Sequence, residues 1–253
     1  MSHSVTSRVT QSAVRSPTPT PTPTPQRTTV AAVTKWRITG LTVLLVIAGV
    51  LYSAWVAEFF LDTGLDPAHS FLSELDAADQ PYRHFFSTAD LITGILLIAA
   101  AALGVSLPRR RPLTTIGWIA VAIFGAATIA DSQLPIECVA ENDPSCPIEP
   151  SGLFPQLHHI HALTSTIAVF AVFTAMIAFT VAAFRYRTLP LIRHLGLAVL
   201  IVTSLATAWL MIADNLPGSY GLGIAQRIQV SGMSLYLVVL GLAVRGRKQL
   251  VSE

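Results

Sequence analysis

The sequence predicts an all-α integral membrane protein, a six-transmembrane-helix bundle with both termini in the cytoplasm. Of its 253 residues, 52% are hydrophobic and 12% are charged, whereas a soluble domain carries about 25% charge. Six apolar segments are long enough to cross a bilayer, which takes about 20 helical residues. The basic residues gather on one side of these segments. A soluble globule is thereby excluded, and a net charge of +2 gives no reason to expect a nucleic-acid partner.

The first 35 residues differ in composition from the rest of the chain. Ser, Thr and Pro dominate them, and Pro alternates with Thr from Pro17 to Pro25. Such a segment cannot bury a core, and alternating proline favours an extended chain. Residues 1–35 are therefore predicted to be a disordered cytoplasmic tail, with a binding motif for a protein partner as the alternative. The apolar segment that follows is too long for a cleaved signal peptide and is expected to stay as an anchor.

The membrane domain is predicted to occupy residues 36–246, followed by a short cytoplasmic tail, 247–253. Its segments are rich in Leu, Ala, Ile and Val and lack the two-residue alternation of barrel strands, so helices must satisfy their backbone hydrogen bonds in lipid. The six predicted helices are 37–60, 82–107, 113–132, 157–184, 194–214 and 225–244.

Charge distribution predicts the orientation of these helices. Fourteen of the 16 basic residues precede the first helix, follow the last or lie in the second and fourth connections, whereas Arg83 and Arg227 lie on the opposite side. Positive charge stays on the cytoplasmic side. We therefore expect a multi-pass protein of the plasma membrane, with the two longer loops on the outer face.

Both long outer loops carry structural signals. Asp66-Pro67 is typical of a helix start, and Phe71, Leu72 and Leu75 then share one helical face, so a short amphipathic helix at the outer interface is expected. The second loop, 133–156, holds the two cysteines, Cys138 and Cys146. A disulfide is predicted because the outer side is oxidising, and it would contribute about 2–3 kcal/mol. The alternative is a metal site shared with the nearby histidines.

The start of the fourth helix holds the most suggestive polar cluster. His158, His161 and Ser165 recur at helical spacing on one face. Two imidazoles one turn apart can bind one metal ion, but zinc needs three or four ligands. The remaining ligands would come from Asp131, Asp90, Glu74 or Asp214. A polar network without metal is the alternative.

Asp90 is expected to lie just inside the hydrocarbon region. A carboxylate there is either functional or held in a buried pair, with Arg83, Arg227 or a histidine as the partner. The inner halves of the helices carry almost no ionisable groups, which disfavours a proton- or ion-coupled transport path. Phosphate-binding, dinucleotide, haem and hydrolase motifs are absent from the sequence. No cofactor is therefore predicted, apart from zinc at the histidines.

Several motifs together resemble the bacterial six-helix membrane protein family catalogued as domain of unknown function 998. They are Ser73-Glu74-Leu75, the stretch from Asp131 through Leu134-Pro135 to Glu137-Cys138 with a second cysteine at Cys146, the histidine-rich start of helix four, and Gln226-Arg227. The resemblance covers residues 36–246, and Glu137 stands where the family pattern has Asp. It implies a six-helix membrane protein without an assigned activity, with polar positions at Glu74, Asp131, Cys138, Cys146, His161 and Arg227.

The sequence leaves three classes of function open. All of them use a polar pocket at the outer face, built from Glu74, Asp90, Asp131, His158, His161, Ser165 and Arg227. The first is a non-enzymatic protein that binds membrane lipids or a protein partner, or senses the envelope. The second is a metal-assisted hydrolase, with His158 and His161 as zinc ligands and Asp131 as ligand or base. The third is a transporter of a small or lipidic substrate.

Overall fold

The computed structural model describes residues 25–107, 111–139, 146, 160–218 and 220–246, and these residues form helices and loops but no strand. Six helices are long and apolar enough to cross a membrane, which confirms the predicted all-α fold. The long helices are α1 (Pro25–Leu51), α2 (Arg83–Val105), α3 (Pro112–Gln133), α4 (Ile160–Arg185), α5 (Leu197–Asp214) and α6 (Leu222–Gly246). Five of the six predicted spans agree with these helices to within three residues at each end.

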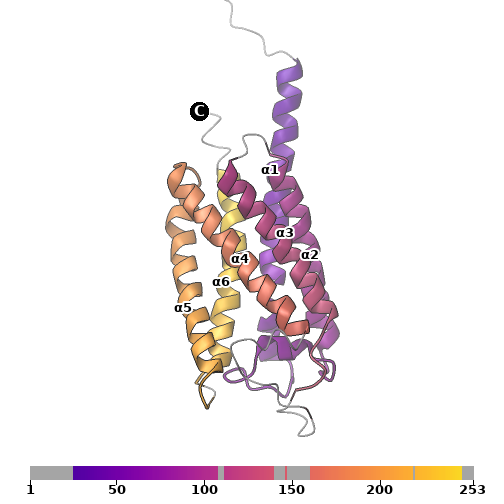
Figure 1. Cartoon of the computed structure of the whole chain (residues 1–253). Helices are drawn as coiled ribbons and strands as arrows, with labels where there is room; N and C mark the ends of the chain where they lie inside the picture. The colour runs from indigo at the N-terminus through magenta and orange to yellow at the C-terminus, as the bar shows by residue number, and fades with distance from the viewer. Residues whose placement is uncertain (1–24, 108–110, 140–145, 147–159, 219, 247–253) are drawn as a thin grey trace, which may run out of the picture.

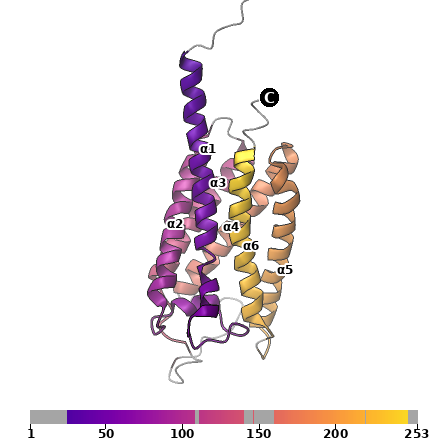
Figure 2. The same cartoon turned by 180° about the vertical axis from the view of Figure 1, so that it is seen from behind.

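The helices stand side by side in one bundle (Figures 1 and 2). α1 packs between α2 and α6, α3 packs between α2 and α4, and α5 packs mainly on α6. The start of α1 and the end of α6 lie at the same end of the bundle, and the longer loops gather at the other, which we call the loop end. Its short helices are η1 (Ala54–Phe60) and η2 (Leu72–Asp76), and a π-helical turn, η4 (Ile192–Gly196), precedes α5 at the opposite end.

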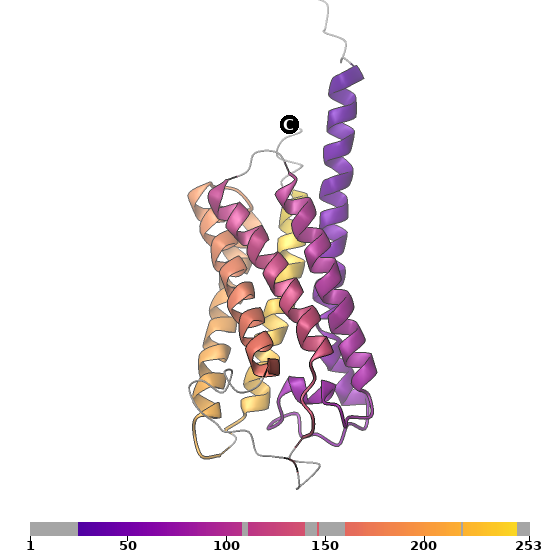
Figure 3. The same ribbon diagram turned by 45° about the vertical axis from the view of Figure 1, so that its right-hand side comes forward.

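The first helix differs from its prediction at both ends. α1 begins at Pro25, inside the segment whose composition predicts a tail, and it projects beyond the other helices (Figure 3). Proline is well suited to the first helical position, and no further proline interrupts the helix after it. At its other end α1 stops at Leu51 and the chain continues as the 3-10 helix η1. Residues 1–24 and 247–253 lie outside the described residues.

The amphipathic helix expected after Asp66 does not form as one continuous helix. The Asp66 carboxylate accepts a hydrogen bond from the Ala68 amide (2.9 Å), as a helix cap would, but only a turn follows before the short η2. The reason is tertiary: the Gly223 amide donates to the Ala68 carbonyl (3.1 Å), and Leu75 is buried against the bundle. The segment folds over the helix ends as a cap.

Small residues let the helices approach closely. A Cβ atom added to Gly94 in α2 would lie 2.5 Å from the Gly125 carbonyl oxygen in α3, and one added to Gly125 would lie 2.7 Å from that of Gly94. Between membrane helices such close contact supplies the packing attraction that the hydrophobic effect provides in water. On the other side of the bundle, the Tyr236 hydroxyl in α6 donates to the Met176 carbonyl in α4 (2.8 Å).

A buried ion pair joins η1 to α6. Arg227 donates to both carboxylate oxygens of Glu58, at 2.7 and 2.6 Å, and both residues are at least 94% buried. Arg227 also donates to the Ser70 and Gly223 carbonyls, at 2.9 and 3.1 Å. Through the bidentate geometry and the two carbonyls, each of the three guanidinium nitrogens has an acceptor. η1, the loop after it and α6 are therefore fixed to one another.

Replacing Glu58 with Gln should destabilise the fold by about 3–5 kcal/mol, because a buried guanidinium loses its counter-charge. Unfolding in detergent measures the loss. Asp62→Asn, which changes an exposed acid four residues along the chain, is the matched control. The double variant Glu58→Leu/Arg227→Met should recover part of the stability, since it leaves no unpaired charge. Wild-type stability of Glu58→Gln would show that the pair does not anchor the loop end.

Candidate functional site

A cavity of about 120 Å³ lies at the loop end of the bundle. Helices α2, α3, α4 and α6 line it together with Tyr52, which follows α1, and with η1 and η2, so it sits beneath the cap. We call it the acidic cavity because three carboxylates line it and no lysine or arginine does, within the described part of the chain. The residues that matter most in its wall are Tyr52, Trp55, Asp76, Asp90, Asp131 and His161.

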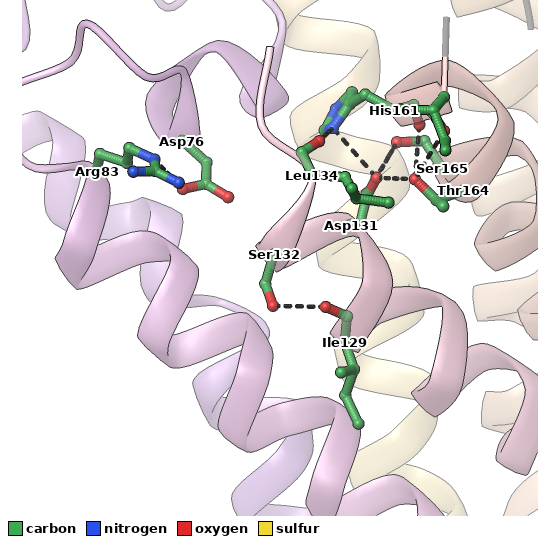
Figure 4. Close-up of polar contacts among 10 residues, drawn as sticks. Asp76, Arg83, Ile129, Asp131, Ser132, Leu134, His161, Thr164 and Ser165 are labelled. Atoms are coloured by element: carbon green, nitrogen blue, oxygen red, sulfur yellow. Dashed lines mark hydrogen bonds and ion pairs between the residues drawn. The ribbon is translucent and has the colours of Figure 1, made fainter. Parts of the chain in front are cut away.

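Asp131, near the end of α3, is held by donors from α4. The Thr164 hydroxyl donates to one carboxylate oxygen at 2.6 Å, and the Ser165 hydroxyl lies 2.9 and 2.8 Å from the two oxygens. The His161 ring nitrogen Nδ1 is 3.3 Å from the same carboxylate. Figure 4 shows these three side chains of one helical turn converging on Asp131. This carboxylate therefore has its hydrogen bonds supplied by the protein.

The His161 ring is oriented with one nitrogen free. Nδ1 lies 2.8 Å from the Leu134 carbonyl oxygen, and because a carbonyl only accepts, Nδ1 carries the proton of this bond. Nε2 is fully buried and has no hydrogen-bond partner among the described residues. The free nitrogen belongs to a side chain that lines the cavity, and it can accept a proton or bind a ligand there.

Asp76, in η2, is buried without a close counter-ion. Its Oδ1 lies 4.0 Å from the Nε of Arg83, and neither of these two atoms has a hydrogen-bond partner in the described part of the chain. Figure 4 shows the pair apart from the Asp131 cluster. Burial, and to a smaller extent the charge of Asp131, raises the pKa of Asp76 to about 7, although Arg83 acts in the opposite direction.

Two more side chains complete the polar wall. The Trp55 indole N–H is buried and has no acceptor among the described residues, and the Asp90 carboxylate makes no hydrogen bond within them. The side-chain oxygen of Gln226, by contrast, accepts a hydrogen bond from the Leu72 amide at 2.6 Å. The cavity thus combines a satisfied side around Asp131 with a side whose polar atoms lack partners.

A second hollow lies on the outside of the bundle. This groove, of about 450 Å³, runs between η1, the turn at Asp66–Ala68 and α6, and most of its wall is apolar. Phe59, Ile224 and Ile228 in this wall are 59%, 52% and 45% exposed. Trp55 lines both the groove and the acidic cavity. We call this hollow the apolar groove.

The family of proteins of unknown function designated DUF998 matches residues 45–243. The match covers more than half of the chain: it contains all of α2 to α5, the last part of α1 and most of α6. The chain belongs to this family. No curated protein and no solved structure matches it.

The sequence singles out seven pocket residues in this DUF998 protein, and four of them line the acidic cavity: Asp90, Asp131, His161 and Ser165. Glu74 instead accepts a hydrogen bond from the Phe71 amide (3.0 Å) and caps η2, while Arg227 pairs with Glu58 rather than with Asp90. His158 lies outside the described residues. Within those residues, no group of three His, Cys, Asp or Glu could hold a metal ion, and Asp214 does not line the cavity.

The disulfide prediction is confirmed. Cys138 and Cys146 are bonded, with their Cα atoms 5.9 Å apart. The segment leading to Cys138 is tied to the cap, because the Ile136 carbonyl accepts from the Ala78 amide at 2.8 Å. Val139, next to the disulfide, packs in the small core beside Leu75 and Phe86. The loop after α3 and the cap over the cavity therefore support one another.

Sequence reasoning missed Asp76, Trp55 and Tyr52. Asp76 is one of several acids in a long loop, and nothing in its neighbourhood marks it as the buried one. Tyr52 and Trp55 belong to an apolar segment in which aromatic residues are ordinarily expected to face lipid. The break after Leu51 is what turns them toward the cavity.

The raised pKa of Asp76 predicts a pH-dependent stability. The pKa of Asp76 is raised from its ordinary value of 3.8 to about 7. At a pH between these two values, Asp76 keeps a proton in the folded chain that it has released in the unfolded chain. Stability therefore falls as pH rises through this window, by up to about 1.4 kcal/mol per pH unit from this group. Unfolding in detergent at pH 5, 6, 7 and 8 measures the slope. Asp76→Asn should reduce it, the exposed Asp62→Asn is the control, and an unchanged slope in Asp76→Asn would contradict the assignment.

Proposed function

We propose that this protein is a non-enzymatic binding protein of the cell membrane that takes the polar headgroup of a lipid into the acidic cavity. The observation that carries the proposal is that three residues of its wall each have a buried polar atom without a partner among the described residues: the Trp55 N–H, Asp76 Oδ1 and His161 Nε2. Each buried polar atom without a partner costs about 1–3 kcal/mol. Three of them around one space are best explained by a group that enters it.

The apolar groove supports a lipid over a water-soluble ligand. An amphiphile needs a polar site and an apolar surface side by side, and Trp55 belongs to the walls of both hollows. The exposed Phe59, Ile224 and Ile228 would contact acyl chains there. Headgroup and chains would then lie on the two sides of the Trp55 indole.

The charge distribution supports a position of this site on the outer leaflet. Apart from Arg83 and Arg227, the basic residues of the described chain gather at the end of the bundle opposite the loops, and the positive-inside rule favours a cytoplasmic position for that end. Both termini would then be cytoplasmic. The disulfide at the loop end supports the same orientation, because such bonds persist on the oxidising side of a membrane.

The proposal is tested by measuring how much lipid stays bound to the protein during purification in a mild detergent. His161→Ala should retain about tenfold less lipid than wild type, since the hydrogen bond that Nε2 accepts from the ligand is lost. The extracted lipid is quantified by mass spectrometry per mole of folded protein. His84→Ala changes an exposed histidine at the same end of the bundle and should retain the wild-type amount. Wild type without lipid, or an unaffected His161→Ala, would reject lipid binding at this site.

A metal-assisted hydrolase is the second candidate, and the orientation of His161 favours it. Its Nδ1 is fixed by Leu134 and Asp131 while Nε2 is free, which is the arrangement of a metal ligand or a general base. A zinc site would need His158 or another ligand in addition to His161 and Asp131.

Metal analysis by mass spectrometry, on protein purified without a histidine tag, tests the hydrolase. Near-stoichiometric zinc in wild type that is lost in His161→Ala would support it, and lipid hydrolysis assays would follow. Folded wild type that contains no zinc and does not hydrolyse lipid would reject it. His84→Ala is again the matched control.

A further inference from the structure

We propose that the group held in the acidic cavity is a primary ammonium, supplied by an ethanolamine-type lipid headgroup or by a free small amine. The inference rests on the proposed function in one respect, that the cavity holds a ligand. It adds the chemical class of that ligand. The argument uses the charges, the unpaired acceptors and the aromatic rings of the cavity wall.

The charges of the wall call for a cation. Asp76, Asp90 and Asp131 line one space of about 120 Å³, and the described wall contributes no lysine or arginine. Like charges this close repel one another strongly away from bulk water. Arg83 is the nearest cation to Asp76, but at 4.0 Å it makes no hydrogen bond to it. A ligand with a positive charge would relieve the repulsion, and an anionic headgroup would increase it.

The hydrogen bonds show where the cation belongs. Asp131 already receives the hydroxyls of Thr164 and Ser165, and Nδ1 of His161 lies 3.3 Å from it, so little of its capacity remains. Asp76 Oδ1 has no donor among the described residues, although Asp76 is 93% buried. Asp90 likewise receives none within the described residues. The unsatisfied acceptors therefore lie on the side of η2 and α2.

Three donors on one nitrogen match this set of acceptors. A primary ammonium donates three hydrogen bonds, and the carboxylate oxygens of Asp76 and Asp90, which line the same cavity, can accept them. A quaternary ammonium has no N–H and would leave these atoms unpaired. Within the described residues, no group of three His, Cys, Asp or Glu could hold a metal ion instead.

The aromatic rings fit the same ligand. Tyr52 and Trp55 both line the cavity, and aromatic faces attract ammonium groups. The unpaired Trp55 N–H, at the wall shared with the apolar groove, can donate to an oxygen between the amine and the acyl chains. An ethanolamine phospholipid carries an amine and such oxygens in this order.

The first arm of the test offers the full-length protein an equimolar mixture of phosphatidylethanolamine, phosphatidylcholine and phosphatidylglycerol with matched chains. Bound lipid is measured by native mass spectrometry. We expect phosphatidylethanolamine to be enriched at least fivefold over phosphatidylcholine, a preference of about 1 kcal/mol. Asp90→Asn should lower the enrichment while lipid is still bound, with Asp76→Asn as a second variant and Asp62→Asn as control. Equal binding of the three lipids, or enrichment of phosphatidylglycerol, counts against the ammonium.

The second arm separates the two sources of the amine. Ethanolamine or tetramethylammonium is added to protein stripped of lipid, and thermal unfolding is followed. Stabilisation by ethanolamine but not by tetramethylammonium supports the primary ammonium. If this occurs without any lipid binding in the first arm, the ligand is a free amine and the lipid proposal fails while the inference stands. If lipids bind without preference and ethanolamine has no effect, the inference is overturned and lipid binding stands.

Discussion

The ion pair between Glu58 and Arg227 is the contact on which the loop end depends. Arg227 reaches four acceptors, two on Glu58 and the carbonyls of Ser70 and Gly223. Next to it, Gln226 accepts from the Leu72 amide. A buried pair of this kind adds little net stability compared with apolar residues, but it is costly to break from one side. Its effect is to give η1 and η2 one position, and that position brings Trp55 and Asp76 to the cavity.

The acidic cavity is built from two unlike halves. On the side of α3 and α4, the hydroxyls of Thr164 and Ser165 supply Asp131 with donors from within the membrane domain. On the side of the cap, Asp76 and the Trp55 N–H are buried without such partners. A stable protein can tolerate a few unsatisfied groups, and they concentrate where a ligand completes them. In the proposed binding function, the satisfied half would give the site its shape and the unsatisfied half its selectivity.

Most of the bundle follows from the sequence because hydropathy is a local property. The spans, the disulfide and the common face of His161 and Ser165 need only neighbouring residues to be recognised. The partner of Arg227 cannot be recognised from neighbouring residues, since Glu58 lies 169 positions away. Several acids at a similar depth in the membrane were equally plausible partners. The conformation of the cap also escaped prediction: its turn follows the Asp66 signal, but contacts with α6 decide its path. Half of the cavity wall therefore depends on contacts that sequence spacing does not encode.

The proton and the proposed ammonium would compete for the same carboxylates. Burial holds the pKa of Asp76 near 7, so near neutral pH the empty cavity reduces its negative charge by taking up a proton. A bound ammonium provides the missing positive charge and a hydrogen-bond donor, and it therefore favours the ionised form of Asp76. By linkage, protonation of Asp76 weakens the binding of a cation to the same degree. The buried acid that makes the empty cavity less stable at higher pH is thus the group that makes the occupied cavity more stable.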